Sequence, residues 1–439
     1  MGRAPAHRAV AGRTSRVGDR AVAHSGGTMV FGTRSRVGAL AATGVATVVV
    51  LSGCAGGESA GGGGDALKLG VITAVGSSLT NYPDVEAGAR AAVDAVNKAG
   101  GVNGKQVEFF FCNTRGEVNQ AVACARQADH DGVDAVVGRV DVYSTQTLPV
   151  LEKAKIPDVG NVSAGAEVDY TSPDTFPLHA GNFGAYGAIP YAHKADGGKK
   201  YVFASIDLPI GIRQGEYAEK VAKNIGLETA PMIKIPAQGV TDYAPYAQQI
   251  KDSGADGATV ALGPAGFQAF VKAADSVGLT ARLSGTAFTF GQSEGAGIGA
   301  LANRMHVTAP FPSTDDKAVP GIAKYHEELD AAGAEDTPAT RRLAGLNAWL
   351  SAHAAMQVAG TVQGPVTRDS MTAALQKTSG MDLYGLVTFS PAELAGQHGT
   401  FARFPKSDYH ALTFDSSIMK DAGLAPIPDP LRTVRGGEG

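Results

Sequence analysis

The sequence predicts an α/β protein with two doubly wound parallel-sheet lobes, joined by a hinge that the chain crosses three times. Three observations predict this fold. Short apolar runs alternate with amphipathic stretches, the alternation occurs in two successive series, and the late part of the chain then becomes mainly helical. Alternating β and α elements are typical of a parallel sheet that is covered by helices on both faces.

The first series of elements begins at Leu67. Its predicted strands are Leu67–Thr73, Val107–Phe111, Ala135–Gly138 and Ile156–Val159, and its predicted helices are Asp84–Lys98, Asn119–Arg126 and Ser144–Lys153. The second series begins after Gly181. Its predicted strands are Tyr201–Ile206, Met232–Ile235, Ala258–Leu262 and Arg282–Ser284, and its predicted helices are Gln214–Ile225, Tyr246–Lys251 and Phe267–Ser276. Each series is long enough to form a sheet with its own core.

The part of the chain after His306 is predicted to return to both sheets. Its helices are expected at Ala318–Asp330, Thr340–Val358 and Ser370–Leu375, and its strands at Leu386–Phe389 and His410–Phe414. Because these helices have no sheet of their own, we expect them to cover the first sheet and the two strands to join the second. Trp349 has core spacing, whereas Tyr325–Leu329 is predicted to be a solvated helix face.

This organisation divides the chain into lobes with a cleft at the carboxyl ends of their strands. The first lobe is expected to comprise residues 66–180 and 308–384. The second is expected to comprise residues 181–307 and 385–430, followed by a tail at 431–439.

Residues 1–54 are predicted to be a lipoprotein signal region, with translation starting at Met29. The apolar run Val37–Leu51 is shorter than the roughly 20 residues that span a bilayer. Leu51-Ser52-Gly53-Cys54 has the form of a bacterial lipobox, so Cys54 is the expected lipidation site; the alternative is an ordinary signal with an unpaired cysteine. The glycine-rich residues 55–65 are typical of a flexible tether. We therefore expect a protein attached to the extracellular face of the cell membrane through lipid on Cys54.

Charge and cysteine usage exclude other classes of partner. The chain has a formal net charge of −4, and residues 1–54 contain seven arginines and one aspartate. The remainder therefore carries about −10, which argues against nucleic acid as a partner. In an exported protein Cys112 and Cys124 are expected to form a disulfide, with two buried thiols as the alternative. No further Cys or His lies at metal-ligand spacing, so no metal and no cofactor are predicted.

The candidate binding residues lie in loops that leave the strands at their carboxyl ends, where backbone amides and side chains can hold a small molecule. The predicted polar contacts of the first lobe are Ser77, Ser78, Tyr143, Asn161 and Ser163, with Val142 and Val162 as apolar wall. Those of the second lobe are Asp207, Ile210 and Phe288. Arg139 and Asp141 are either a mutual ion pair or ligand contacts.

Signals for an enzyme are weak. Asn161-Val162-Ser163-Ala164-Gly165 resembles a nucleophile elbow, but asparagine occupies the position of the first glycine. No catalysis is therefore expected, and a surface hydrolase that uses Ser163 remains an alternative.

Several segments resemble the type I periplasmic binding proteins of the leucine/isoleucine/valine-binding family, the receptors of ABC importers. They are Leu69–Ile72, Glu86–Asn97, Gly100–Lys105, Val137-Gly138, Ser144–Gln146, Leu148-Pro149 and Gly278-Leu279, and the resemblance covers roughly residues 66–420. It implies a monomeric receptor that encloses a solute between two lobes and delivers it to ABC permease subunits. A ligand-sensing receptor of the same fold, coupled to a signalling partner, is the alternative.

The residues at the family's amino-acid clamp differ from the family pattern. By this resemblance the clamp positions fall on Val142, Val162, Ser163 and Ala164 in the first lobe and near Ile210, Pro264 and Ala287 in the second. Only Ser163 keeps a hydroxyl group, and a buried ammonium group would lack a carboxylate partner. The expected ligand is therefore a small, partly apolar solute, either an amino acid, an amide or an organic acid.

Overall fold

The computed structural model describes residues 66–435 except 78–79, 335–336, 338–339, 398–400 and 417. The predicted lipidation site Cys54, the tether and the candidate contact Ser78 lie outside the described residues. The described residues belong to one compact unit.

The first sheet is built around β1 (Lys68–Thr73). β2 (Glu108–Asn113) pairs with one edge of β1, and β3 (Ala135–Val137) and β4 (Val140–Asp141) pair with its other edge. β5 (Asp158–Val159) and β6 (Val162–Ser163) follow, and β7 (Thr175–Phe176) pairs with β5. All these pairs are parallel, which confirms the fold class predicted for this half.

The second sheet has the order β10-β8-β11-β12-β13-β16-β17, and β9 also pairs with β8. Its parallel strands are β8 (Lys200–Ile206), β9 (Glu228–Thr229), β10 (Ile233–Ile235), β11 (Gly257–Ala261), β12 (Arg282–Thr286) and β13 (His306–Ala309). β16 (His410–Asp415) and β17 (Ile418–Asp421) extend it as an antiparallel pair. The strand expected at His410–Phe414 therefore joins the second sheet as predicted.

Helices cover both sheets. The first sheet carries α1 (Pro83–Lys98), α2 (Val118–His130), α3 (Ser144–Lys153), α4 (Val168–Thr171), α10 (Pro320–Ala331), α11 (Leu343–Thr361) and α12 (Arg368–Leu375). The second carries α5 (Gly181–Ala195), α6 (Pro209–Asn224), α7 (Ala244–Ser253), α8 (Pro264–Ser276), α9 (Gln292–Ala296) and the 3₁₀ helix η1 (Gly299–Arg304); the 3₁₀ helix η2 (Pro391–Leu394) follows β15 in the chain.

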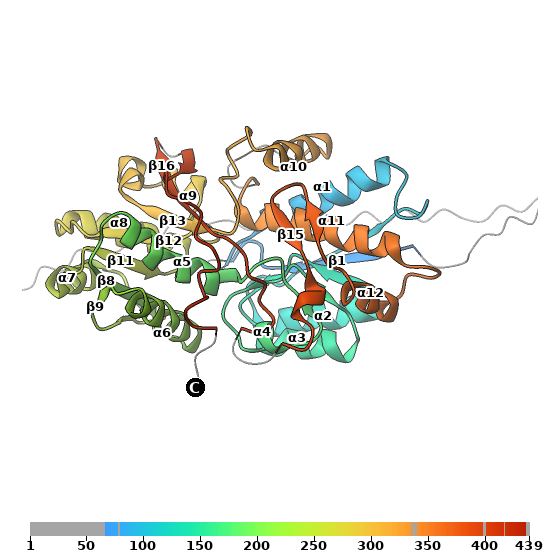
Figure 1. Cartoon of the computed structure of the whole chain (residues 1–439), viewed down its shortest axis with the longest axis horizontal. Helices are drawn as coiled ribbons and strands as arrows, with labels where there is room; N and C mark the ends of the chain where they lie inside the picture. The colour runs from blue at the N-terminus through green and yellow to red at the C-terminus, as the bar shows by residue number, and fades with distance from the viewer. Residues whose placement is uncertain are drawn as a thin grey trace, which may run out of the picture. The chain divides into compact units, whose positions relative to one another are not determined.

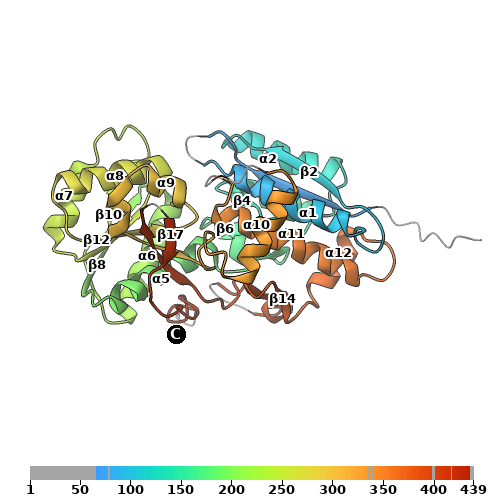
Figure 2. The same cartoon turned by 90° about the horizontal axis from the view of Figure 1, so that it is seen from above.

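Late helix α11 lies against the early helix α1, and α10 lies beside both (Figures 1 and 2). Nearly every residue of α11 is buried, because the helix also packs against β3 and β5. A helix that is apolar on all sides is typical of such a central position. The prediction that the late helices cover the first sheet is confirmed.

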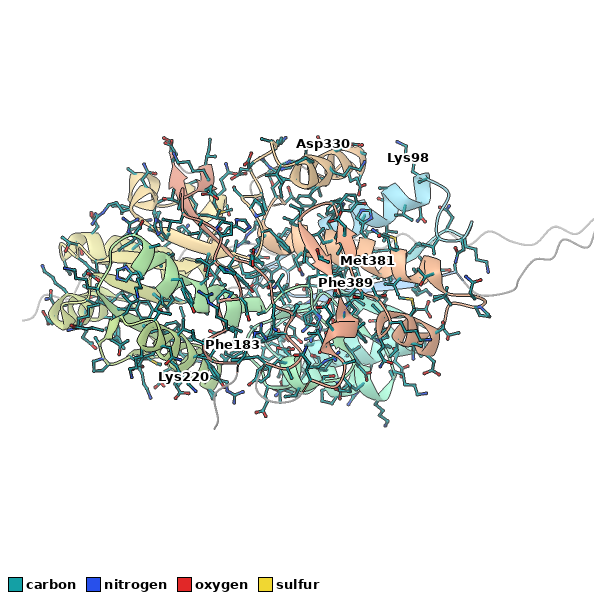
Figure 3. The ribbon with its side chains drawn as sticks, viewed as in Figure 1. Lys98, Phe183, Lys220, Asp330, Met381 and Phe389 are labelled. Carbon is teal, nitrogen blue, oxygen red and sulfur yellow. A yellow bond between two sulfur atoms is a disulfide. The ribbon has the colours of Figure 1, made fainter. Side chains whose placement is uncertain are left out.

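The strand predicted at Leu386–Phe389 does not join the second sheet. β15 (Val387–Phe389) instead pairs with β14 (Met381–Leu383) in a separate hairpin, in which Met381 lies opposite Phe389 (Figure 3). The connecting residue Tyr384 fixes this hairpin to α11, because its hydroxyl lies 3.1 Å from His353 Nδ1 and its ring lies 4.5 Å from the Trp349 ring. These contacts hold the segment beside the first sheet.

The prediction of a solvated helix face at Tyr325–Leu329 is wrong. All of these residues except Glu327 are buried, because α10 packs on α1 and α11. The Glu328 carboxylate accepts a hydrogen bond from Trp349 Nε1 at 2.6 Å and lies 2.8 Å from His353 Nε2. Trp349 is fully buried, as its spacing predicts.

The predicted disulfide between Cys112 and Cys124 is present, with 5.6 Å between the two Cα atoms. It links the end of β2 to the second turn of α2. Within the described part of the chain, no helix is both long and apolar enough to cross a membrane, and no cluster of His, Cys, Asp or Glu side chains is suited to hold a metal ion.

Candidate functional site

Two neighbouring strands of the first sheet break at the same level. Gly138 separates β3 from β4 with φ +59°, and Gly160 separates β5 from β6 with φ +68°. A Cβ atom on Gly138 would lie 2.5 Å from Ala348 Cα, and one on Gly160 would collide with the Ser351 hydroxyl. Glycine is therefore required here both for its conformation and for the close approach of α11. These breaks direct the chain that follows each strand toward the carboxyl edge.

Arg139 connects the segments at this edge. The guanidinium group is 1% exposed and donates from Nε to Asp158 Oδ2 at 2.8 Å, from Nη1 to Ser144 Oγ at 2.8 Å and from Nη2 to Asp169 Oδ1 at 3.2 Å. Asp141 Oδ2 lies 3.3 Å from Nη1. Burial raises the pKa of Asp169 to about 6 and also raises that of Asp158, although Arg139 acts against both shifts.

Of the two alternatives for Arg139 and Asp141, the structure therefore contains the ion pair. Asp141 also accepts hydrogen bonds from the Tyr143 backbone N–H at 2.7 Å and from Thr147 Oγ1 at 2.6 Å. The pair fixes the backbone on which Val142 and Tyr143 lie.

Ser163 and Asn161 have different surroundings. Ser163 Oγ donates to Asp169 Oδ2 at 3.2 Å and accepts from the Gly165 backbone N–H. Its partners in the described structure do not include a histidine. Asn161 is 1% exposed, and neither its Oδ1 nor its Nδ2 has a hydrogen-bond partner within the described structure. Buried amides are nearly always hydrogen-bonded, so Asn161 is the stronger candidate for a ligand contact.

The other first-sheet candidates lie beside the loop that follows β2. Tyr143 donates its hydroxyl to the Gly116 carbonyl at 2.7 Å, and a Cβ atom on Gly116 would collide with Ser77. Ser77 and Tyr143 therefore flank the same glycine. Val142 is half-buried and Val162 is 3% exposed.

The second-sheet candidates are not equally placed. Ile210, in the first turn of α6, lies against Gly165 of the first-sheet edge. Phe288 is buried, and its ring centroid lies 5.4 Å from that of His179. Asp207 is exposed, and its backbone N–H donates to the Ile235 carbonyl at 2.7 Å.

Residues that the sequence did not indicate connect the two carboxyl edges directly. Gln214 of α6 donates from Nε2 to the Ala164 carbonyl, and Arg213 donates from Nη1 to the Tyr170 hydroxyl at 3.1 Å. Elsewhere along the edges, Arg342 Nη2 lies 3.1 Å from Glu294 Oε1, and both side chains are about nine-tenths buried. Glu294 belongs to α9, and Arg342 directly precedes α11.

The group around Arg342 is ionisable and buried. Burial raises the pKa of Tyr82 to about 12 and that of Asp84 to about 6, and Arg342 opposes both shifts. Asp84 Oδ2 accepts a hydrogen bond from the Gly345 N–H at 2.6 Å, whereas its Oδ1 has no partner within the described structure. The sequence analysis placed Arg342 inside the predicted helix Thr340–Val358 and gave no signal for this role; α11 in fact begins at Leu343.

His179 lies in the first of the three connections between the sheets. The Gly181 N–H donates to its Nδ1 at 3.0 Å, so Nε2 carries the proton that faces Asn347 Oδ1, also at 3.0 Å. Burial lowers the pKa of His179 to about 4, and the ring is therefore neutral. Its ring centroid also lies 5.4 Å from that of Phe311 in the second connection.

Two mainly parallel sheets that meet at their carboxyl edges and are joined by three connections define a two-lobed binding protein. A family model described as "Periplasmic binding protein" matches residues 66–404. The chain therefore belongs to the periplasmic binding protein family, and its named relatives place it with the type I proteins of the leucine/isoleucine/valine-binding group.

Similar known proteins agree with this assignment. The chain is 41% identical over 83 residues to a leucine-, isoleucine-, valine-, threonine- and alanine-binding protein of Pseudomonas aeruginosa. The matched segment covers 19% of this chain and 22% of that protein. The chain is 39% identical over 75 residues to a Leu/Ile/Val-binding protein homologue of Brucella melitensis, 17% and 20% of the two chains. The matched segments thus span about a fifth of these relatives.

Solved structures share the fold over most of the chain. A solute binding protein of an ABC transporter from Rhodopseudomonas palustris HaA2, in complex with p-hydroxybenzoic acid, has a TM-score of 0.71 at 20% identity and covers 83% of this chain and 98% of its own. An extracellular ligand-binding receptor from Verminephrobacter eiseniae has a TM-score of 0.69 at 18% identity, with 81% and 99% covered. At these identities the likeness shows the fold alone.

Proposed function

We propose that the protein is the lipid-anchored, extracellular solute-binding component of an ABC importer. It captures a small, partly apolar solute between two lobes and presents the closed form to the permease, without making or breaking a bond. Membership of the periplasmic binding protein family and the names of its relatives support the receptor role. The form of the sequence at Cys54 supports the lipid anchor.

The proposal depends mainly on the surroundings of Asn161. Its amide is buried at the carboxyl edge of the first sheet without a partner in the described structure. A donor and an acceptor at one position can orient a carboxylate, carbonyl or amide group of a solute. Val142, Val162 and Ile210 are apolar and supply the wall. This combination suits an amino acid, an amide or an organic acid.

Closure is proposed to follow from contacts that the solute makes with both edges at once. The moving bodies are the first sheet with α10–α12 and the β14–β15 hairpin, and the second sheet with β16–β17. They would rotate about the connections near residues 177–180, 310–319 and 401–408. The Arg342–Glu294 ion pair and the Gln214–Ala164 hydrogen bond would then form on closing.

A thermal-shift panel tests the capture of solute. The full-length chain is heated with amino acids, amides, and aliphatic or aromatic carboxylates; a ligand at 100 times its Kd adds about 2.7 kcal/mol of stability. We expect Asn161→Leu to weaken binding of the best solute at least tenfold, and Asn119→Leu, on an exposed turn of α2, to leave it unchanged. Equal binding by both variants would exclude Asn161 as a contact.

Lobe closure is tested by a distance measurement. Lys98 at the end of α1 and Lys220 on α6 are exposed and lie on different lobes (Figure 3). Spin labels are attached after Lys98→Cys and Lys220→Cys in a Cys54→Ser chain. The distribution of label distances should narrow when the solute found in the panel is added. A distribution that is the same with and without solute, or solute turnover that is lost on Ser163→Ala, would contradict the proposal.

A further inference from the structure

A cavity lies among the three connections between the sheets. Its volume is 340 Å³, within the range of about 300–1,000 Å³ that is usual for small-molecule sites. Leu178 and His179 of the first connection line it, together with Pro310 and Phe311 of the second and Lys406 and Asp408 of the third. We call it the hinge pocket. None of the predicted solute contacts lines it.

The remaining wall of the hinge pocket comes from the β14–β15 hairpin, through Asp382 and Gly385–Thr388. Asp382 is engaged within its own turn, because both carboxylate oxygens accept from the Gly385 N–H at 3.2 Å. Leu386 and Val387 are half-buried and give the pocket apolar surface, whereas Leu178 and Phe311 are 1% and 0% exposed. The hairpin thus contributes both apolar and polar groups to this side of the pocket.

Lys406 and Asp408 add a cationic and an anionic group to the pocket, which the Asp382 carboxylate also lines. The side chains of Lys406 and Asp408 are exposed, and neither has a hydrogen-bond or ion-pair partner within the part of the chain that the structure describes. His410, the next polar group of the wall, has a pKa lowered by burial and adds no further charge near neutral pH.

We propose that the hinge pocket binds a small zwitterion with an apolar side chain, such as a free apolar amino acid. Its carboxylate would pair with Lys406, its ammonium group with Asp408, and its side chain would lie on Leu386 and Val387. A ligand with only one charge can pair with only one of Lys406 and Asp408, and a purely apolar ligand can pair with neither.

Occupancy of the pocket would favour the arrangement of the connections that forms it. All three connections contribute walls, so rotation of the lobes changes its shape. His179 lines the pocket and also contacts Phe288 at the carboxyl edge of the second sheet, with 5.4 Å between ring centroids. This coupling rests on the proposed lobe motion, whereas the binding of the zwitterion does not.

Three related probes test the charge requirement by calorimetry with the full-length chain. They are L-leucine, 3-methylbutylamine, which lacks the carboxylate, and 4-methylpentanoate, which lacks the ammonium group. We expect leucine to bind at least tenfold more tightly than either analogue. Lys406→Met and Asp408→Asn should each weaken leucine at least tenfold, and Thr388→Phe should abolish binding by filling the pocket. Lys272→Met, on an exposed position of α8, is the matched control.

Trp349 provides an optical readout, because it is the only tryptophan of the chain and its ring lies 4.5 Å from Tyr384 of the hairpin. Leucine should change the emission of Trp349 in the native chain but not in Thr388→Phe. It should also change the emission of Trp349 in Ile210→Trp, after the emission of the added tryptophan has been subtracted. Binding that survives all three pocket variants, or equal binding of the three probes, overturns the proposal. Loss of leucine binding in Ile210→Trp alone would assign leucine to the cleft between the two carboxyl edges. That result would support the proposed function and would contradict binding in the hinge pocket.

Discussion

Replacement of Arg139 by methionine is expected to destabilise the first sheet severely. The guanidinium group is 1% exposed and lies within 3.3 Å of three carboxylates, from Asp141, Asp158 and Asp169. Removal of one partner of a buried ion pair costs about 3–5 kcal/mol, because the remaining charge is left without compensation. Arg139→Met leaves up to three such charges, so we expect a loss of at least about 3 kcal/mol in the free energy of unfolding at pH 7.

The assay is urea unfolding of the full-length chain, followed by far-UV circular dichroism at pH 7 and pH 5. Without Arg139 the pKa values of Asp158 and Asp169 rise further in the folded state, and a raised folded pKa favours folding at low pH. The variant should therefore recover part of its stability at pH 5. Arg90→Met is the control, because its pair with Glu86 is partly exposed and is worth under about 1 kcal/mol. A loss in Arg139→Met no larger than that of the control would refute the reasoning.

Three further changes test other parts of the first sheet. Burial raises the pKa of Asp84 to about 6 in the folded state. The contribution of Asp84 to stability is therefore present below about pH 4 and is lost as the pH rises through 6, which lowers the free energy of unfolding by about 2–3 kcal/mol. Asp84→Asn should flatten this decline in a series of unfolding curves measured at different pH values. The double substitution Cys112→Ala/Cys124→Ala should lower the free energy of unfolding by about 3 kcal/mol, and an unchanged urea midpoint would contradict this. Gly160→Ala should lower the free energy of unfolding by more than about 1 kcal/mol, because Gly160 has a positive φ and an added Cβ atom would collide with Ser351. A urea midpoint equal to that of the native chain would contradict this and would show that α11 can shift to make room.

The sequence predicted most of the fold because hydrophobic periodicity and glycine-bounded turns are local signals. It failed where long-range packing decides the outcome. Tyr325–Leu329 has the charges of a solvated face, yet Glu328 is buried because Trp349 and His353, one turn apart on α11, both reach its carboxylate. The prediction that the strand Leu386–Phe389 joins the second sheet failed for the same reason, because Tyr384 is held by long-range contacts that no local sequence pattern indicates.

The candidate site was predictable in part. Loops at the carboxyl ends of parallel strands follow from topology, and the structure places Ser77, Tyr143, Asn161 and Ser163 on the first-sheet edge. Whether a given polar group is free to bind a solute depends on its partners. Ser163 is engaged by Asp169, whereas Asn161 has no partner in the described structure, and nothing in the residues 161–163 distinguishes the two.

The two edges differ in how their candidate residues are held, and this difference has a consequence for binding. At the first-sheet edge, Arg139 and the close approach of α11 at Gly138 and Gly160 fix the backbone through contacts within one lobe. At the second-sheet edge, Ile210 and Gln214 are positioned by contacts with Gly165 and Ala164 of the other lobe. If the lobes separate as proposed, only the first edge keeps its geometry. A solute should therefore dock first on the edge that carries Asn161, and substitutions at Ile210 or Gln214 should raise its dissociation rate more than they lower its association rate.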